Sequence, residues 1–399
     1  MKKRFFNRFL LKPTSFLSLL VLLLAGCTGQ STRQFASASV VEAIGGGNDS
    51  SQDQKFAHAT APRPFTFPRD HGPHPEYRTE WWYYTGNLQD DQGEQYGYQL
   101  TFFRSGLTEQ MPARQSDLAT NQFYMAHFAV TSQPANEHLS FERYSRGAAG
   151  LAGATGDPSY QVWLEDWVVK QTGDGVYTLQ ATAQDKSGPV TLAFTLHETR
   201  PPVLHGNAGL SQKGPETGNA NYYYSLVNLE TTGQLTFAGK SVAIKGLSWM
   251  DHEFGTSSLG GDITGWDWFS AQLDNGAVLM FGTFHDGQGE SRYVYEGSLV
   301  FPDNRKVRLT QGDFVVKTLD HWKSPTTGIT YPSGWQVNFP KYNLTMEIQP
   351  LVQDQEMRVR FIYYEGATTI KATMNGAAVN GRGYVELTGY GEQLKTYQR

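Results

Sequence analysis

Hydrophobic and polar residues alternate along most of the chain with a period of two. In residues 189–198 (PVTLAFTLHE) the even positions from 190 to 196 are apolar, and residues 176–184 (VYTLQATAQ) show the same pattern. Successive side chains of a strand point to opposite faces, so this is the pattern of a strand with one buried face. We find no long amphipathic helical stretch. The pattern predicts an all-β, mostly antiparallel fold of sandwiches or closed barrels.

Short polar-glycine dipeptides separate several of these apolar runs. They are Asp174-Gly175, Asn275-Gly276 and Thr232-Gly233. Tight hairpin turns need backbone conformations that glycine adopts without strain, so each dipeptide is expected to be a turn between two strands.

The N-terminus has the features of a bacterial lipoprotein signal peptide. A basic stretch precedes an apolar run at residues 16–24, which is shorter than the roughly 20 residues of a membrane-spanning helix. Leu24-Ala25-Gly26-Cys27 follows and resembles a lipobox, whose cysteine becomes the lipidated first residue of the mature chain. Cys27 is the only cysteine, so an intramolecular disulfide is excluded. We predict a signal peptide at residues 1–27, lipidated at Cys27.

Residues 28–60 are rich in Ser, Gln, Gly, Ala and Asn and predict a flexible tether. Thr28, rather than an aspartate, follows the cysteine. By resemblance to sorting rules this implies the periplasmic face of the outer membrane in a Gram-negative host, and a lipid-anchored place in the bacterial cell envelope in any case. The net charge is −5 with no basic stripe, which argues against a nucleic-acid partner.

Motifs in the body of the chain resemble a known family. They are PHPEYRTEWWY (73–83), QLTFFR (99–104), AHFA (126–129), SWMDHEFG (248–255), GWDWF (265–269) and GYVELTGY (383–390). In order and wording they are similar to the AttH family of predicted secreted proteins, related to hydroxyneurosporene synthase, the carotenoid 1,2-hydratase. The resemblance implies two lipocalin-like β-barrels in tandem. We place them at residues 61–255 and 256–399.

The motif at residues 248–255 contains the triplet Asp251-His252-Glu253. On an extended strand Asp251 and Glu253 would share one face, whereas His252 would point the other way. The triplet could converge on one ligand only in a loop or bulge. A metal site would need further ligands, such as His74, His127 or Glu80, and no spacing in the sequence supports one. A structural polar clasp, an acid–base role and a metal site remain the alternatives.

Other charged residues stand inside aromatic segments. Glu80 and Arg104 both flank aromatic pairs, and a buried charge is costly unless it is paired, so we expect a buried ion pair between neighbouring strands. The alternative is a polar anchor at the mouth of an apolar cavity. His127 lies in a strand that is apolar on both faces, where a hydrogen-bonded core histidine is more common than a catalyst.

Three functions fit these features. The first is a barrel that binds a hydrophobic small molecule, such as a lipid, isoprenoid or polyene. The second is a hydratase or isomerase of a hydrophobic alkene, with an aspartic acid of raised pKa, Asp251 or Asp267, as proton donor. His252 would orient the acid, and tryptophan faces would stabilise a carbocation. The third is a hydrolase, a label given to some family members, although no nucleophile elbow or zinc-protease motif is present.

The candidate residues follow from these hypotheses. The catalytic candidates are Asp251, His252, Glu253 and Asp267. The ligand-binding candidates are Glu80, Trp82, Arg104, His127, Trp249, Trp266 and Trp268. We find no cofactor motif, neither a dinucleotide fingerprint nor a phosphate-binding loop, and predict no cofactor and no metal.

Overall fold

The computed structural model describes residues 55–111, 113, 115–214, 216–256, 263–286 and 291–391, without the side chains of 286 and 291–295. The predicted signal peptide, Cys27 and most of the predicted tether lie outside the described residues. Within them the chain is almost entirely strand and turn, with two short 3-10 turns, η1 (Arg69–His71) and η2 (Pro340–Tyr342). No helix in these ranges has the length and apolar character needed to cross a membrane. The predicted all-β fold is confirmed.

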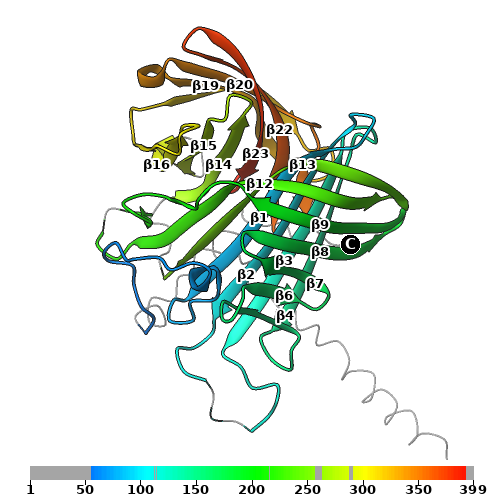
Figure 1. Ribbon diagram of the computed structural model, residues 1–399, viewed down its shortest axis with the longest axis vertical. Coiled ribbons are helices and arrows are strands. Elements are labelled where there is room, and N and C mark those ends of the chain that lie inside the picture. Colours follow the sequence, from blue (N-terminus) through cyan, green and yellow to red (C-terminus); the bar gives the residue numbers. More distant parts are fainter. Residues whose placement is uncertain are drawn as a thin grey trace, which may run out of the picture. The chain divides into compact units, whose positions relative to one another are not determined.

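Sheet A is a nearly closed antiparallel barrel of 13 strands (Figure 1). Its strands are β1 (Thr79–Gln89), β2 (Gln95–Gly106), β3 (Gln122–Ser132), β4 (Glu137–Arg146), β5 (Ala152–Thr155), β6 (Gln161–Leu164), β7 (Trp167–Gly173), β8 (Val176–Asp185), β9 (Gly188–Glu198), β10 (Val203–Leu204), β11 (Leu210–Gln212), β12 (Ala220–Phe237) and β13 (Lys240–Gly255). The order is β4-β3-β2-β1-β13-β12-β9-β8-β7-β6-β5, and β10 and β11 pair with β12. β1 and β13, the first and last of these strands along the chain, therefore lie side by side. We call this unit barrel A.

Sheet B is a half-barrel of ten antiparallel strands. Its strands are β14 (Ile263–Leu273), β15 (Val278–Asp286), β16 (Ser291–Val300), β17 (Lys306–Leu309), β18 (Val315–Lys323), β19 (Thr330–Phe339), β20 (Leu344–Pro350), β21 (Glu356–Arg358), β22 (Ile362–Met374) and β23 (Ala377–Leu387). The order is β17-β16-β15-β14-β23-β22-β20-β19-β18, and β21 pairs with β22. The chain thus forms two barrel-like units in tandem, as the family resemblance implies.

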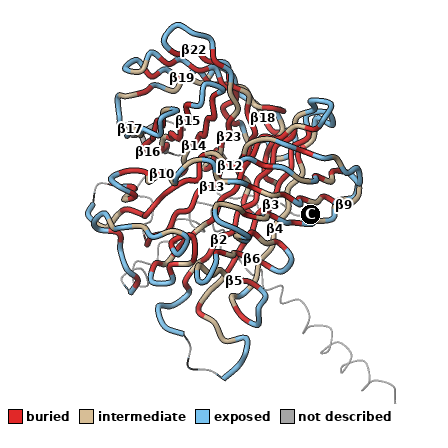
Figure 2. Tube along the Cα trace, in the orientation of Figure 1, coloured by how far each residue is buried: buried red, intermediate tan, exposed pale blue. Residues whose placement is uncertain are grey.

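Each unit has its own apolar interior, and Figure 2 shows the buried residues concentrated along the strands. In β9 the alternating residues Val190, Leu192, Phe194 and Leu196 are at most 2% exposed, which confirms the predicted period of two. Burying one such side chain contributes roughly 1.5–3 kcal/mol. In sheet B the stacked rings of Phe269 and Phe281, with centroids 4.9 Å apart, form part of a second core.

The outward faces of the two sheets pack against each other. Tyr83 and Trp249 of barrel A form one buried cluster with Trp268 and Met280 of sheet B. Polar contacts cross the same boundary, and one of them runs from the Tyr83 hydroxyl to Glu365 Oε2 at 2.8 Å. We call this contact the sheet interface. It is made by outward residues of β1, β3, β12 and β13 against those of β14, β15, β22 and β23.

Two of the three predicted turns are present, and the third is wrong. Gly175 and Gly276 have positive φ angles of 61° and 82° and lie between strands. Thr232-Gly233 instead lies inside β12. A Cβ on Gly233 would come within 2.2 Å of the Ala193 carbonyl oxygen of β9, so glycine allows close strand packing there.

Residues 55–78, the described segment before β1, are packed onto barrel A rather than extended from it. Phe56 and Ala59, which fall in the segment predicted as tether, are 4% and 0% exposed. The amide of Ala57 donates to the carbonyl oxygen of Glu76. This packing brings residues 63–77 over one end of barrel A, where they contribute to the polar network described below.

Candidate active site

The triplet Asp251-His252-Glu253 lies on the regular strand β13, and its residues alternate between two environments. His252 is directly opposite Trp82 of β1, inside barrel A, whereas Asp251 is opposite Tyr83, on the sheet interface. All three residues are at most 3% exposed. The strand therefore carries two separate polar sites on its two faces, and the triplet does not converge on one ligand.

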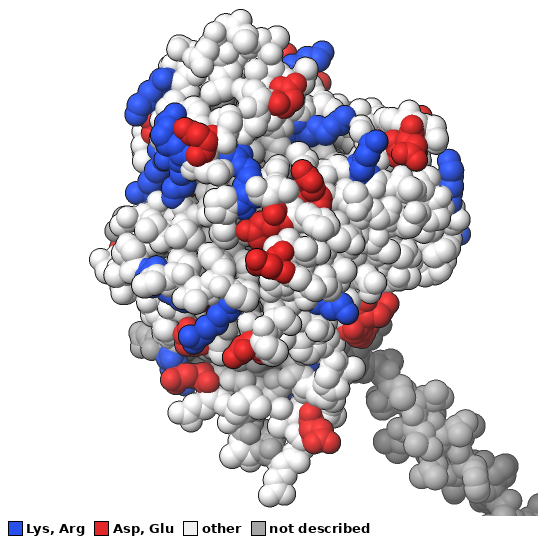
Figure 3. Space-filling model, in the orientation of Figure 1, with Lys and Arg blue, Asp and Glu red and all other residues white. Residues whose placement is uncertain are grey.

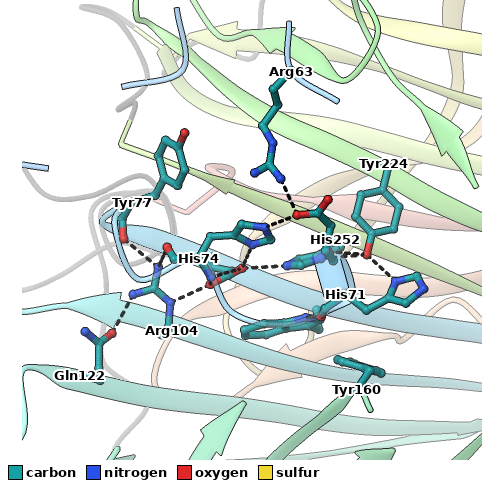
Figure 4. Close-up of polar contacts among 12 residues, drawn as sticks. Arg63, His71, His74, Tyr77, Arg104, Gln122, Tyr160, Tyr224 and His252 are labelled. Atoms are coloured by element: carbon teal, nitrogen blue, oxygen red, sulfur yellow. Dashed lines mark hydrogen bonds and ion pairs between the residues drawn. The ribbon is translucent and has the colours of Figure 1, made fainter. Parts of the chain in front are cut away.

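Glu80 is the centre of a buried polar network inside barrel A. Figure 4 shows how His74, Arg104 and His252 lie in this network. Glu80 Oε2 accepts a hydrogen bond from Arg104 Nε at 2.8 Å, and Glu80 Oε1 lies 2.8 Å from His74 Nδ1 and 2.9 Å from His252 Nε2. Arg104 also donates to the carbonyl oxygens of His74 and Tyr77. Glu80 and Arg104 are directly paired on β1 and β2. The predicted buried ion pair between neighbouring strands is therefore present.

Residues before β1 extend this network. η1 places Asp70 Oδ1 3.1 Å from His74 Nε2, and Arg63 forms an ion pair with Asp70. Burial opposes ionisation of Glu80, but the Arg104 charge and hydrogen bonds from His252 and His74 hold its pKa well below the usual range. Burial also acts against a charged His74, yet hydrogen bonds to Asp70 and Glu80 raise its pKa.

Aromatic groups enclose the rest of His252. Its ring stacks on Trp82 with centroids 5.0 Å apart, and the indole Nε1 of Trp82 donates to the carbonyl oxygen of His71. The Tyr224 hydroxyl lies 2.9 Å from His252 Nδ1 and 2.7 Å from His71 Nδ1. Burial lowers the pKa of His252. Both ring nitrogens of His252 thus have partners.

One atom each from His74, Glu80 and His252 lie within 4.8 Å of one another, a spacing that a metal ion could bridge. The charges around these three residues argue against a bound metal ion. Arg63 and Arg104 already balance the carboxylates of Asp70 and Glu80, so a divalent cation would add its whole charge to a site removed from water. The network therefore fits a structural clasp between the N-terminal segment and barrel A better than a metal centre.

Asp251 occupies the sheet interface, surrounded by hydrogen-bond donors. Its Oδ2 accepts from the Tyr223 hydroxyl at 2.8 Å, and its Oδ1 accepts from Trp249 Nε1 at 2.6 Å and from Ser225. Trp268 Nε1 of sheet B donates to the Tyr223 hydroxyl at 3.1 Å. Burial raises the pKa of Asp251 to about 7, although the three donors act in the opposite direction. Its two oxygens are enclosed, and its clearest role is to orient Tyr223.

Glu365 and Glu386 form a second acidic pair on the interface. They are direct partners on the antiparallel strands β22 and β23, so their side chains lie on the same face. Burial, followed by the charge of Glu386, raises the pKa of Glu365 well above its usual range. Burial likewise raises the pKa of Glu386 to about 8, opposed by a hydrogen bond from Trp266. Both groups therefore favour the protonated form more strongly than an ordinary carboxyl group does.

The two residues differ in how deeply they are buried. Glu365 is 1% exposed and accepts from Tyr83, whereas Glu386 and the neighbouring Trp266 keep part of their surface exposed. Glu386 is also the direct partner of Trp268 on β14, which places it beside an indole ring. A molecule that enters the interface can therefore reach Glu386 more readily than Asp251 or Glu365.

The remaining candidate residues from the sequence, His127, Glu253 and Asp267, lie apart from one another. His127 Nδ1 is 2.7 Å from the Tyr363 hydroxyl at the interface, and burial lowers its pKa to about 3. Glu253 pairs with Lys213 at 2.6 Å. Asp267 faces away from Trp266 and Trp268 and accepts from the Tyr390 hydroxyl at 2.8 Å; burial raises its pKa to about 6.

The sequence predictions did not include Glu365, Glu386 and Tyr223 as site residues. A signal for Glu386 was available, because it stands between Val385 and Leu387 in an apolar strand, as Glu80 stands beside tryptophans. A lone acid in a buried strand needs a partner or a shifted pKa. The pairing of Glu386 with Glu365 depends on strand register and had no such signal.

Comparison with known proteins identifies relatives. The sequence profile of the AttH-like family matches residues 58–390. A solved structure described as an AttH from Nitrosomonas europaea is 31% identical, has a TM-score of 0.74, and is matched over 84% of this chain and 100% of that one. Kievitone hydratase from Nectria haematococca shares the fold, with 17% identity, a TM-score of 0.63, and coverage of 85% and 97%.

A curated relative is the dehydratase asqC of Emericella nidulans, 24% identical over 208 residues. The match covers 50% of this chain and 58% of that protein, so the chain spans little more than half of that relative's length. The protein is therefore related in sequence to a dehydratase and shares its fold with a hydratase. The chain belongs to the AttH-like family.

Proposed function

We propose that this protein is a hydratase or dehydratase that adds water to, or removes it from, a hydrophobic substrate at the sheet interface. The observation that carries the proposal is the Glu386 carboxyl group, whose pKa burial raises to about 8, beside Trp266 and Trp268. The relatives named hydratase and dehydratase support the reaction class.

The chemistry needs a proton donor, a group that stabilises positive charge, and water. In hydration, the neutral Glu386 carboxyl would give its proton to one alkene carbon and leave a carbocation on the other. The π faces of Trp266 and Trp268 would stabilise that cation. Water would then add to the cation and return a proton to the Glu386 carboxylate. Dehydration runs through the same steps in reverse.

The other polar groups of the interface have supporting roles in this proposal. The charges of Asp251 and Glu253 also raise the pKa of Glu386, after the larger effect of burial. The Tyr223 hydroxyl donates a hydrogen bond to Asp251 and accepts one from Trp268. Asp251, one of the two acids expected from the sequence beside Asp267, is thus a positioning residue, and Glu386 is the proposed catalytic acid.

A test uses isotopic water. Wild-type protein is incubated in ¹⁸O-water with a panel of hydrophobic alkenes, and with ¹⁸O-labelled tertiary and allylic alcohols, and exchange is followed by mass spectrometry. We expect oxygen incorporation or loss with wild type and a fall of about 100-fold or more in Glu386→Gln, the usual size of a general-acid contribution. Glu347→Gln changes an exposed acid of β20 and should behave as wild type. Undiminished turnover in Glu386→Gln would overturn the assignment.

Binding without turnover is the second candidate, and a pocket of about 330 Å³ beside the interface favours it. A carrier would retain a stoichiometric hydrophobic molecule through purification but would exchange no oxygen with any substrate in the panel. Native mass spectrometry of protein from its own host, with lipid extraction of the same sample, separates the two outcomes.

The proposed setting of this activity is the bacterial cell envelope, with the protein held at a membrane by a lipid on Cys27. The support is the lipobox-like segment and the polar stretch after it. A hydrophobic substrate partitions into membranes, so an anchor of this kind would raise the local concentration of both partners.

A further inference from the structure

A pocket of about 330 Å³ opens beside the sheet interface. On one side it is lined by the segment that connects β9 to β12, including Arg200, Val203 and Leu204. On the other side are Val300 of β16 and Lys306 of β17. Its volume lies near the lower end of the roughly 300–1,000 Å³ typical of small-molecule sites.

The floor of the pocket is continuous with the interface core. Val203 and Val300 belong to the same buried cluster as Tyr223, Trp249 and Trp268. The residue after Leu204 is His205, whose Nε2 lies 2.6 Å from Ser225 Oγ, and Ser225 in turn donates to Asp251. An apolar body in this pocket would therefore lie against the walls of the proposed active site.

The polar groups around the pocket are cationic. Arg200 is engaged, because it donates to Asn304 Oδ1 and to the carbonyl oxygens of Gly276 and Phe301. Lys306 Nζ donates to the carbonyl oxygen of Leu204 and has two further N–H groups to offer. No carboxylate is among the described residues that line the pocket.

The acids near the pocket are shared among several cations. Glu296 acts on Lys306 and also forms an ion pair with Arg308 at 3.2 Å, and Asp303 acts on Arg200. Figure 3 shows Lys and Arg side chains gathered at the upper left, where Figure 1 places β16, with acidic side chains among them. The rim of the pocket thus has positive potential above an apolar floor, which suits an amphiphile with an anionic end.

From this geometry we infer that the pocket binds an amphiphilic carboxylate, with its apolar chain on Val203, Leu204 and Val300 and its carboxylate on Lys306. The inference rests on the proposed function, because it names the substrate class of that site. The substrate is then an unsaturated or hydroxylated molecule that carries a carboxylate remote from the reacting carbon.

The experiment maps the site by photo-crosslinking. The full-length protein in lipid nanodiscs is irradiated with a diazirine derivative of decanoate, and the labelled residues are identified by mass spectrometry. We expect labels in residues 200–208 and 300–306. An excess of decanoate should reduce labelling, whereas an excess of decyltrimethylammonium should not, because only the anion pairs with Lys306.

Two variants test the charged part and the apolar part of the pocket in turn, and a third is a control. Lys306→Met keeps the apolar stem and removes the charge, and should lower labelling about tenfold, the equivalent of about 1.4 kcal/mol and of one charge-assisted hydrogen bond. Leu204→Trp fills the pocket and should abolish labelling. Lys317→Met changes an exposed lysine of β18 and should leave labelling unchanged. Thermal melting of each variant confirms that it folds.

The outcomes distinguish this inference from the proposed function. Glu386→Gln should keep full labelling while losing turnover, since it lies outside the pocket. The carboxylate site would be overturned by labels spread over other parts of the chain, or by equal labelling in wild type and Lys306→Met. Neither result would bear on the proposed catalytic role of Glu386. Labelling as expected with no turnover in any assay would support the pocket and reject the hydratase.

Discussion

Replacing Arg104 by methionine tests whether the network inside barrel A is a structural clasp. Arg104 is 1% exposed and makes four hydrogen bonds, to Glu80 Oε2, Gln122 Oε1 and the carbonyl oxygens of His74 and Tyr77. Methionine retains much of the apolar stem, so packing is largely kept. The main loss is the partner of the buried Glu80 carboxylate.

The expected cost follows from that unpaired charge. Removing one partner of a buried ion pair typically costs about 3–5 kcal/mol. Glu80 would still accept from the backbone amide of His74 at 2.9 Å and face His74 and His252, so we expect the lower end, about 3 kcal/mol. Urea unfolding at pH 7, followed by tryptophan fluorescence, measures the free energy of unfolding.

Two controls make this result decisive. Arg305→Met removes an exposed arginine whose pairing distance to Asp303 is 4.0 Å, and should cost less than about 1 kcal/mol. In a double-mutant cycle, Glu80→Gln combined with Arg104→Met should cost clearly less than the sum of the two single changes. A loss below about 1 kcal/mol for Arg104→Met, or strictly additive losses, would refute the clasp.

The remaining predictions concern protons, metal and the anchor. The raised pKa of Glu386, about 8, lies above the ordinary carboxyl value of about 4, so the folded state binds more protons, and the free energy of unfolding should fall as pH rises between those values. Urea midpoints across this range should show a shallower slope for Glu386→Gln, and an identical slope would contradict the assignment. Zinc or iron added to metal-free protein should bind substoichiometrically and leave the melting temperature unchanged, as judged by elemental analysis and calorimetry; a tightly held ion lost on changing His74 to alanine would contradict the charge argument. Labelling of cells with radioactive palmitate should mark the wild-type protein and not Cys27→Ser, and equal labelling would reject the lipobox.

Much of the fold could be predicted because each strand records its environment in its own residues. The apolar even positions of β9 define its buried face without reference to any other strand. The pairing of Glu80 with Arg104 was also predictable, because each is a charge beside aromatic residues and needs an opposite charge nearby. Likewise, the extended alternation of Asp251 and His252 follows from strand geometry alone.

The rest depends on tertiary contacts that leave no periodic pattern. Asp70 and His74 join Glu80 only because the irregular segment before β1 folds over one end of barrel A. Glu365 meets Glu386 through the register of β22 and β23, and a shift of one residue would separate them. Thr232-Gly233 has the composition of a turn, but close packing against β9 explains its glycine.

Strand β13 separates the interior of barrel A from the sheet interface, and this limits how its sequence can change. Inserting or deleting one residue before Asp251 would send His252 to the sheet interface and Asp251 into barrel A, and so disrupt both polar sites together. Substitutions at neighbouring positions, in contrast, should act independently: a change at 252 alters the clasp and a change at 251 alters the setting of Tyr223. Variation in length along β13 should therefore be far less tolerated than variation in composition, and a selection from random libraries should recover substitutions there without insertions or deletions.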